Sequence, residues 1–469
     1  KQKTKWNMKP TKNKTWFLLL LWVSPFFWGQ VPLTEEAFLQ VVLKNHPMVL
    51  QSSIKPQIGN ATLLKAKGSF DPKFTGSIEQ KYFDGNQYYG LSDFGLTLPT
   101  WYGLTLKSGL EKNRGSFMDP QAKTPMGGLF YGGIYANLGQ GLLIDQRRAD
   151  IQKAEVLKKQ NDQEQRYMLN QLVYESGYSY WNWFLAYHTR EIVLKAYEVA
   201  KQRFEAIKTT AELGDRAFID TVEAGLQVQN RLSMLREAEM RLANEAAIQE
   251  TFLWTPETEP LTLSSNSLPS DLQTWKASIA LVNYADSMVE NHPYLQISQF
   301  KIDALEIDQK LKRDRLKPLV ELNYNLLNEP VNYNPFSSLN INDYKWGMSV
   351  QMPLFLRKER GDLQLATLKI NDAQLELKQT QAYLKMKIQT ALIELSNSLN
   401  QLSILSQTVN DSKALLDAEK DMFENGESSL FLINMRELAY VQSELKLLEW
   451  KAKNKQLGYS LGFSTATLY

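Results

Sequence analysis

The sequence contains no cysteine and only three histidines among 469 residues. Without cysteine, disulfides, thiolate metal ligands, a cysteine nucleophile and a lipidated N-terminal cysteine are all excluded. Lysine and arginine (53) nearly balance aspartate and glutamate (51), so no basic field favours a nucleic-acid partner. HExxH, P-loop and GxSxG motifs are also missing, and no histidine lies near a suitable Ser/Asp pair. We therefore expect no enzyme activity, no bound metal and no cofactor.

Long apolar runs are scarce as well, and the longest lies near the N-terminus. Six lysines in the first fourteen residues precede an apolar run over residues 16–28. A basic segment followed by an apolar run this short resembles a secretory signal rather than a membrane-spanning helix of about 20 residues. We expect residues 1–29 to hold a signal peptide. Met8 is the expected true start, and cleavage is expected near Gly29–Gln30.

Proline is missing from residues 140–255 and again after Pro353. Each stretch allows a helix of roughly 65–70 residues, or about 100 Å at 1.5 Å per residue. A glycine follows each, Gly214 in AELGDRA and Gly426 in FENGESS, and glycine at a helix end lets the chain turn. We expect two long helical hairpins, over residues 145–252 and 356–457. The first carries a narrow apolar stripe typical of coiled-coil packing, formed by Ile151, Ala154, Leu157, Leu169, Leu172, Val173 and Tyr180.

The tripeptide NHP occurs twice, at residues 45–47 and 291–293. Its histidines either contribute to one metal or acid–base site, or they mark a duplication. Matched spacings favour a duplication: 25 positions separate Pro47 from Pro72 and Pro293 from Pro318, and 73 separate Gly141 from Gly214 and Pro353 from Gly426. We therefore interpret NHP as a corner between two helices. In this interpretation the asparagine is left-handed, the histidine is extended and the proline begins the next helix, so that His46 and His292 are incidental to function.

One interval differs between the two halves. Pro72 to Gly141 covers 69 positions and Pro318 to Pro353 covers 35, so the first half has an excess of 34 residues (69 − 35). The excess forms either a longer surface loop or an additional β-hairpin.

Sequence with a period of two lies between the helices of each half. In residues 70–82 apolar side chains alternate with polar ones, and residues 102–111, 320–326 and 344–352 repeat this pattern. Segments of about ten residues with aromatics near their ends are typical of transmembrane β-barrel strands, although a half-buried sheet has a similar pattern. Four aromatics are candidates for anchoring at the lipid interface or for strand-to-strand contacts: Trp101, Tyr102, Tyr344 and Trp346.

These features divide the chain into four parts. They are the signal peptide (1–29), a first repeat (30–254) with strands at about 70–139, a Pro/Ser-rich linker (255–276), and a second repeat (277–469) with strands at about 317–353. Each repeat opens with a helix, one capped by Thr34 and ending at Asn45, the other over residues 277–291.

Over residues 30–465 the chain resembles the TolC family of outer-membrane efflux proteins. The resemblance rests on the order of elements in each half: helix, NxP, helix, strands, P/G-L-[LF] and long hairpin. The first tip, GDRAFIDTVEA, matches the family pattern in which Gly214 is followed after six residues by Asp220 and after ten by Ala224. The second tip, GESSLFLINMRE, departs from this pattern because Leu432 stands where Asp220 aligns.

The resemblance implies a mainly α fold with a transmembrane β-barrel portion. Each protomer of a homotrimer would contribute four strands to one 12-stranded β-barrel, and its long coiled-coil hairpins to a periplasmic α-barrel. The expected function is an outer-membrane duct of a tripartite efflux pump or type I secretion system, a passive conduit for small molecules or polypeptides. Outer-membrane lipid, a periplasmic adaptor protein and an inner-membrane transporter would be its partners. The alternative is a non-channel periplasmic coiled-coil adaptor or scaffold.

Several tip residues are candidate functional residues. Asp220 and Glu223 are three apart and so lie on one helical face, where three copies would form an acidic ring that gates the periplasmic end. The alternative is that Arg216 and Asp220 form an ordinary surface pair. The candidates for adaptor contact are Leu213, Gly214, Ala217, Phe218, Gly426, Leu430 and Phe431, with packing inside the trimer as the alternative. His188, in YSYWNWFLAYH, is expected to be a packing residue.

Overall fold

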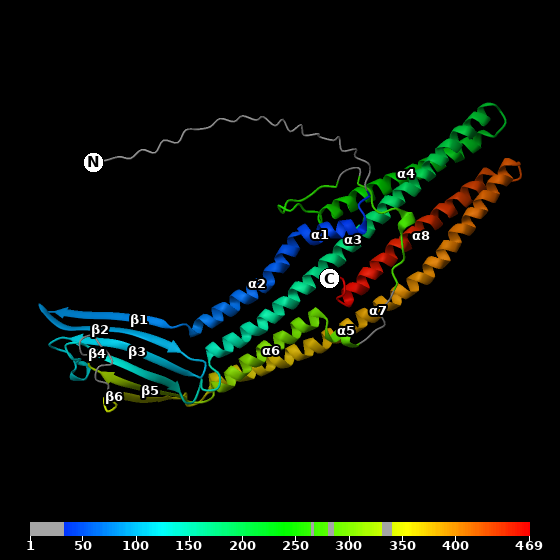
Figure 1. Cartoon of the computed structure of the whole chain (residues 1–469). Helices are drawn as coiled ribbons and strands as arrows, with labels where there is room; N and C mark the ends of the chain where they lie inside the picture. The colour runs from blue at the N-terminus through cyan, green and yellow to red at the C-terminus, as the bar shows by residue number, and fades with distance from the viewer. Residues whose placement is uncertain (1–31, 264–266, 280–285, 331–339) are drawn as a thin grey trace, which may run out of the picture.

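The computed structural model describes residues 32–263, 267–279, 286–330 and 340–469. A sheet lies at one end, and two long helical hairpins extend away from it to the opposite end (Figure 1). The expected signal peptide and its cleavage site lie outside the described residues.

The helices form two sets in the same order. The first repeat contains α1 (Glu35–Asn45), α2 (Pro47–Lys67), α3 (Gln146–Glu212) and α4 (Phe218–Glu250); the second contains α5 (Asp286–Glu290), α6 (Pro293–Asp314), α7 (Arg357–Glu424) and α8 (Leu430–Ser464). Helices α3 and α7 have 67 and 68 residues, which corresponds to about 100 Å each. Helices α4 and α8 return from the tips with 33 and 35 residues. Both long hairpins are confirmed, and α8 continues beyond residue 457.

Within the described residues, no helix combines the length and the apolar character that a membrane crossing requires.

One predicted helix is wrong at its start. Residues 277–279 are irregular rather than helical, because Asn454 of α8 binds this segment through its backbone. The Asn454 side-chain oxygen accepts from the Ser278 N–H at 2.7 Å, and its amide donates to the Ser278 carbonyl at 3.2 Å.

The two NHP tripeptides form the same corner. Thr34 caps α1, as predicted, and α1 ends at Asn45. His46 is extended (φ −64°, ψ 135°), and its Nδ1 accepts from the Met48 N–H at 3.1 Å, which caps the start of α2. His292 caps α6 in the same way through the Tyr294 N–H at 3.2 Å. The predicted left-handed asparagine is wrong at both corners, because the histidine side chain caps the next helix directly.

Within the described residues, the sheet has six antiparallel strands in chain order. They are β1 (Lys73–Phe83), β2 (Asn86–Pro99), β3 (Leu104–Arg114), β4 (Leu129–Asn137), β5 (Leu319–Asn328) and β6 (Tyr344–Gln351). The first repeat therefore supplies four strands and the second supplies two. The prediction of four strands per protomer is therefore wrong. The 34-residue excess of the first repeat forms an additional antiparallel pair of strands.

The two faces of the sheet differ in polarity from the first strand to the last. Residues opposite each other in an antiparallel pair share a face. The register therefore gathers an apolar set on one face, including Phe74, Ile78, Phe94, Leu96, Leu106, Leu110, Ile134, Leu322, Tyr324, Trp346, Met348 and Val350. The opposite face holds Thr75, Ser77, Glu79, Asp93, Lys107, Glu111, Tyr131, Tyr135, Glu321, Asn323, Lys345 and Ser349.

Hydrogen bonds and ring contacts connect the strands across the polar face. The Tyr131 hydroxyl donates to Asp93 at 3.0 Å, and its ring crosses Gly109 and Gly95, where any Cβ would collide with it. Further along the face the Lys107 ammonium lies 3.7 Å from the centre of the Tyr135 ring.

The main hydrophobic core lies midway along the hairpins, where α1 packs against α3 and α8. Its buried side chains include Phe38, Val42, Tyr180, Phe184 and Leu448. The Tyr180 hydroxyl hydrogen-bonds the Leu33 carbonyl and Ser270 of the linker.

A second set of contacts at this level centres on Glu35. Its carboxylate accepts from the Trp181 indole at 2.8 Å and the Tyr459 hydroxyl at 2.5 Å, and pairs with Lys455 at 3.4 Å. The start of α1 is thus attached to both α3 and α8.

Candidate functional site

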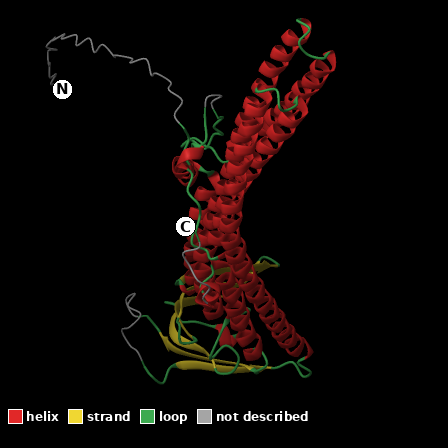
Figure 2. Ribbon diagram, turned by 90° about the vertical axis from the view of Figure 1, so that its right-hand side faces the viewer, coloured by secondary structure: helices red, strands yellow, loops and turns green. Residues whose placement is uncertain are grey.

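Both hairpin tips lie at the end of the molecule remote from the sheet (Figures 1 and 2). Gly214 (φ +84°) and Gly426 (φ +80°) turn the chain in the left-handed region that favours glycine. A Cβ at either position would meet nothing within 4 Å. The two glycines are therefore required by the backbone conformation and not by close packing.

The apolar tip residues divide into exposed and buried ones. Leu213 and Phe218 of the first tip are 73% and 78% exposed, and Phe431 of the second is 58% exposed; Ala217 is exposed as well. Leu430 is only 4% exposed, so its predicted availability for adaptor contact is wrong. It begins α8 and packs with Ile207 and Ala224 of the first hairpin.

The candidate gate residues have different partners. The Arg216 guanidinium lies 3.9 Å from the Asp220 carboxylate, which is the geometry of the alternative surface pair. The same guanidinium lies 4.5 Å from the centre of the Phe423 ring in α7, so it also contacts the second hairpin. Glu223 instead accepts from the Asn434 amide of α8 at 3.3 Å. The acidic ring of Asp220 and Glu223 stays a prediction.

A polar contact joins the two hairpins one to three turns below the tips. Arg203 of α3 donates to Glu437 of α8 at 2.5 Å and to Asn434 at 3.1 Å, and Asn434 in turn contacts Glu223 of α4. We call Arg203, Glu223, Asn434 and Glu437 the inter-hairpin contact. The Arg203 and Glu437 side chains are largely shielded from solvent, so this ion pair is screened less than a surface pair.

Arg231 lies close to this contact and is buried. Burial lowers the pKa of its guanidinium, the Glu437 carboxylate opposes that effect, and the Arg203 charge adds to it. Glu437 is therefore the carboxylate that compensates two arginines.

The inter-hairpin contact was missed at the sequence level, although a signal was present. Arg203 follows Ala196 and Ala200 and precedes Ile207 along one buried stripe of α3. Glu437 likewise lies between Ile433 and Val441 on the buried stripe of α8. A charged residue at a stripe position indicates a buried pair.

The four interface aromatics lie near the two ends of the sheet. Trp101 and Tyr102 occupy the turn between β2 and β3, on the side of the helices, and Trp101 contacts the Phe70 ring. Tyr344 and Trp346 lie at the start of β6, near the opposite end, and share the apolar face. All four are exposed. Their anchoring role stays a prediction.

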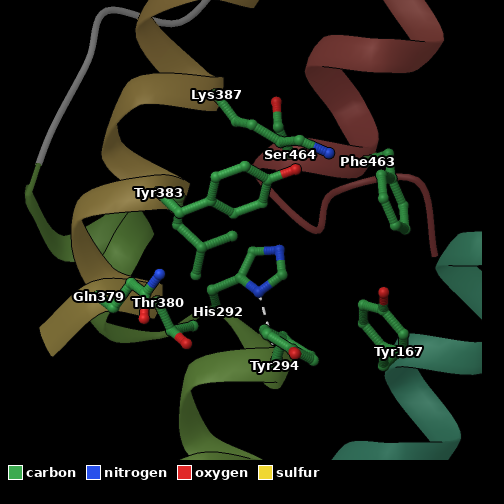
Figure 3. A pocket seen from close by; sticks show the side chains of 10 residues that line it. Tyr167, His292, Tyr294, Gln379, Thr380, Tyr383, Lys387, Phe463 and Ser464 are labelled. Carbon is green, nitrogen blue, oxygen red and sulfur yellow. Dashed lines mark hydrogen bonds between the residues drawn. The ribbon is translucent and has the colours of Figure 1, made fainter. Parts of the chain in front are cut away.

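A cavity of about 390 Å³ lies where α3, α6, α7 and α8 meet. Figure 3 shows His292 among the lining side chains, with the rings of Tyr167, Tyr294, Tyr383 and Phe463 around it. The imidazole Nδ1 is already occupied by the cap of α6, and burial lowers the pKa of His292. The cavity lining also includes polar side chains, among them Gln379, Thr380 and Lys387. His292 has a structural role there as the cap of α6.

His188 lies in the core, where its ring contacts Phe184 and its Nε2 hydrogen-bonds the Ser270 carbonyl at 3.1 Å. In the described part of the chain no group of three or more His, Asp or Glu side chains is arranged to hold a metal ion.

Residues 285–452 match the family model described as outer membrane efflux protein. No curated protein matches the chain by sequence.

Solved structures with the same fold cover nearly the whole chain. The CmeC outer membrane channel of Campylobacter jejuni is 13% identical, with a TM-score of 0.66 over 92% of this chain and 85% of that one. The MtrE outer membrane channel of Neisseria gonorrhoeae is 11% identical (TM-score 0.68, 92% and 88% covered). The outer membrane protein VceC of Vibrio cholerae is 12% identical (TM-score 0.64, 92% and 96% covered). At these identities the similarity establishes the fold.

Proposed function

Because residues 285–452 match the outer membrane efflux protein family, we propose that the chain is the outer-membrane duct of a tripartite efflux pump or a type I secretion system. Three copies form a passive conduit through which small molecules or polypeptides leave the periplasm. Its role is transport and not catalysis.

The two-faced sheet is the observation that carries this proposal. An exposed apolar face that continues over all six strands matches a surface in contact with lipid, and the polar face opposite it matches a water-filled interior. A soluble scaffold would bury one of these faces against a core, whereas the apolar side chains of β1 and β6 are exposed.

The long hairpins support the periplasmic half of the proposal. Helices of 67 and 68 residues extend the conduit by about 100 Å from the membrane. The exposed side chains of Leu213, Phe218 and Phe431 form the docking surface for a periplasmic adaptor, which links the duct to an inner-membrane transporter.

The inter-hairpin contact supports a closed resting state. Arg203, Glu437 and Asn434 hold the two hairpins of one chain together near the tips. Separating the hairpins would expose two arginines and leave them without their shared carboxylate. We propose that adaptor binding opens the tips by breaking this contact, and that Asp220 contributes to cation preference at the opening.

Fractionation of cells that express the full chain tests the function. A heat-modifiable trimer in the outer-membrane fraction, which conducts ions in planar bilayers after purification, is the expected result. Release with the soluble periplasm, without conductance, would contradict the channel and favour the alternative, a periplasmic adaptor or scaffold.

A further inference from the structure

Strands β1 and β6 are the two edges of the sheet. Within the described residues β1 pairs only with β2, and β6 only with β5. Each edge therefore presents an unpaired row of backbone N–H and C=O groups. In lipid such groups have no water to bind, so an open edge is not tolerated.

Charged residues are few on the two edges, with Lys73, Glu79 and Lys81 on β1 and Lys345 on β6. Both strands lack proline, and the register shift in β1 lies at its far end, between Lys81 and Tyr82. The side chains of β1 are exposed along its whole length. Phe74 and Ile78 are each 74% exposed on the apolar face. An edge this long and apolar is suited to pairing with another strand.

The two edges are complementary to each other. Since β1 runs away from the helices and β6 runs back towards them, β6 of one chain can pair antiparallel with β1 of the next. Such pairing continues both the apolar and the polar face across the junction. On the polar face Lys345 of β6 lies in the half remote from the helices, as do Glu79 and Lys81 of β1. A register that places Lys345 beside Glu79 brings opposite charges together.

Resting on the trimer of the proposed function, we propose that β1 and β6 pair between copies and close one sheet of eighteen strands. The partner at each edge is a second copy of this chain. Strands about 4.8 Å apart and tilted by about 40° give a ring about 36 Å across for eighteen strands, against about 24 Å for twelve. The membrane part is then half again as wide as a twelve-stranded one, and the narrowest part lies at the hairpin tips.

The additional strands belong to the wall and not to a surface loop. β2 and β3 place Phe94, Leu96, Leu106 and Leu110 on the apolar face in register with their neighbours. On the polar face Asp93 of β2 binds Tyr131 of β4 across β3. A hairpin folded outside the ring would lose these contacts.

Disulfide cross-linking tests the pairing directly, since the chain has no cysteine of its own. Ser349→Cys on β6 is combined in turn with Thr75→Cys, Ser77→Cys or Glu79→Cys on β1, all on the polar face. Four strands separate the two edges within one chain, so a disulfide between them can form only between copies. Ser349→Cys is paired with Thr105→Cys or Lys107→Cys on β3 as the matched control.

Oxidation in intact outer membranes should shift at least one β1–β6 variant from the mass of one chain to that of three. The β3–β6 controls and the single variants should stay at one chain. Cross-linking of β3 to β6 instead would mean twelve strands with β1 and β2 outside the ring, and would overturn the proposal. A product that stops at two chains would also overturn it, because two copies close twelve strands.

Failure of this inference is distinguishable from failure of the proposed function. A conducting outer-membrane trimer without β1–β6 cross-links would overturn the eighteen-stranded sheet alone. Protein that is released with the periplasm would overturn both.

Discussion

The two repeats agree closely in their helices and differ in their strands. Their long hairpins differ by one residue in the outgoing helix and two in the returning helix. Their strand regions differ twofold, with four strands against two. The hairpins must reach the same tip level from the same base, so their lengths are coupled. A sheet can instead grow by two strands at a time, because an added pair keeps every later strand in its direction and on its face.

The tips differ as well, although their backbones are the same. Position 220 is aspartate in the first tip, and the equivalent position 432 (220 + 212) is leucine in the second. Similar backbones thus carry different chemistry, and substitutions at equivalent positions separate what the fold requires from what transport requires.

The largest effect is expected where the repeats meet each other. Glu437→Ala leaves Arg203 and Arg231 buried without their carboxylate, which costs about 3 kcal/mol. Thermal unfolding by circular dichroism and protease sensitivity of the tips should both report the loss, and single-channel current should rise. Glu419→Ala is the matched control, because Glu419 contacts Ser428 and Arg436 of its own hairpin. Equal effects of both variants would contradict a specific link between hairpins.

The next largest loss of stability is expected at Gly139, near the end of the sheet where the helices begin. A Cβ at Gly139 would lie 2.1 Å from the Pro318 carbonyl oxygen, so Gly139→Ala forces backbone to move and costs about 2 kcal/mol. The equivalent residue of the second repeat (139 + 212) is Gln351, which is exposed. Gln351→Ala should leave the urea midpoint, followed by tryptophan fluorescence, unchanged. The glycine requirement would be refuted if both variants unfolded at the same urea concentration.

The equivalent histidines should act alike. His46→Ala and His292→Ala each remove a helix cap, at a cost of about 1 kcal/mol. Burial lowers the pKa of both imidazoles from 6.5. The folded state therefore binds fewer protons than the unfolded one, so this stability is present above pH 6.5 and is lost as the pH falls below it.

Substitution by asparagine separates the cap from the titration. His46→Asn with His292→Asn retains an acceptor without a titrating group, so its melting temperature should fall less between pH 7 and pH 5 than that of the parent. An identical pH dependence would contradict this account, because every other titrating group is the same in both proteins.

The smallest effect on stability and the most specific effect on transport are expected at the first tip. Asp220→Ala removes a partly exposed pair with Arg216 worth a few tenths of a kcal/mol. If three copies form an acidic ring, it should lower the cation preference measured in planar bilayers. Leu432→Ala tests the equivalent position. Unchanged conductance and ion preference for Asp220→Ala would eliminate the gate role.

The helical hairpins were predictable because long proline-free stretches and single glycines are strong local signals. Strands β1, β3, β5 and β6 were predictable from alternation. β2 and β4 were missed because glycines interrupt their pattern, among them Gly95, Gly132 and Gly133. Gly95 is needed to admit the Tyr131 ring, a contact between strands that no local pattern contains.

The positions of the two hairpin tips were predictable from Gly214 and Gly426. The side-chain contacts between the tips were not predictable. Leu430 is apolar and next to a turn, and only the packing of α8 against the first hairpin shows that it is buried. The partnership of Arg203 with Glu437 joins residues 234 positions apart. Such pairs depend on how two hairpins align, which sequence spacing within either hairpin does not contain.

Glu35 has a consequence for the order in which the molecule is completed. Its partners Lys455 and Tyr459 follow it by 420 and 424 positions, almost the full length of the chain. The contacts of Glu35 with Lys455 and Tyr459 therefore cannot form until α8 has been synthesised and exported. Closing so long a loop is slow. Any chain that stops short of Lys455 leaves this carboxylate with Trp181 alone. Contacts between the two ends of the chain thereby distinguish complete copies from truncated ones before the proposed ring of three can form.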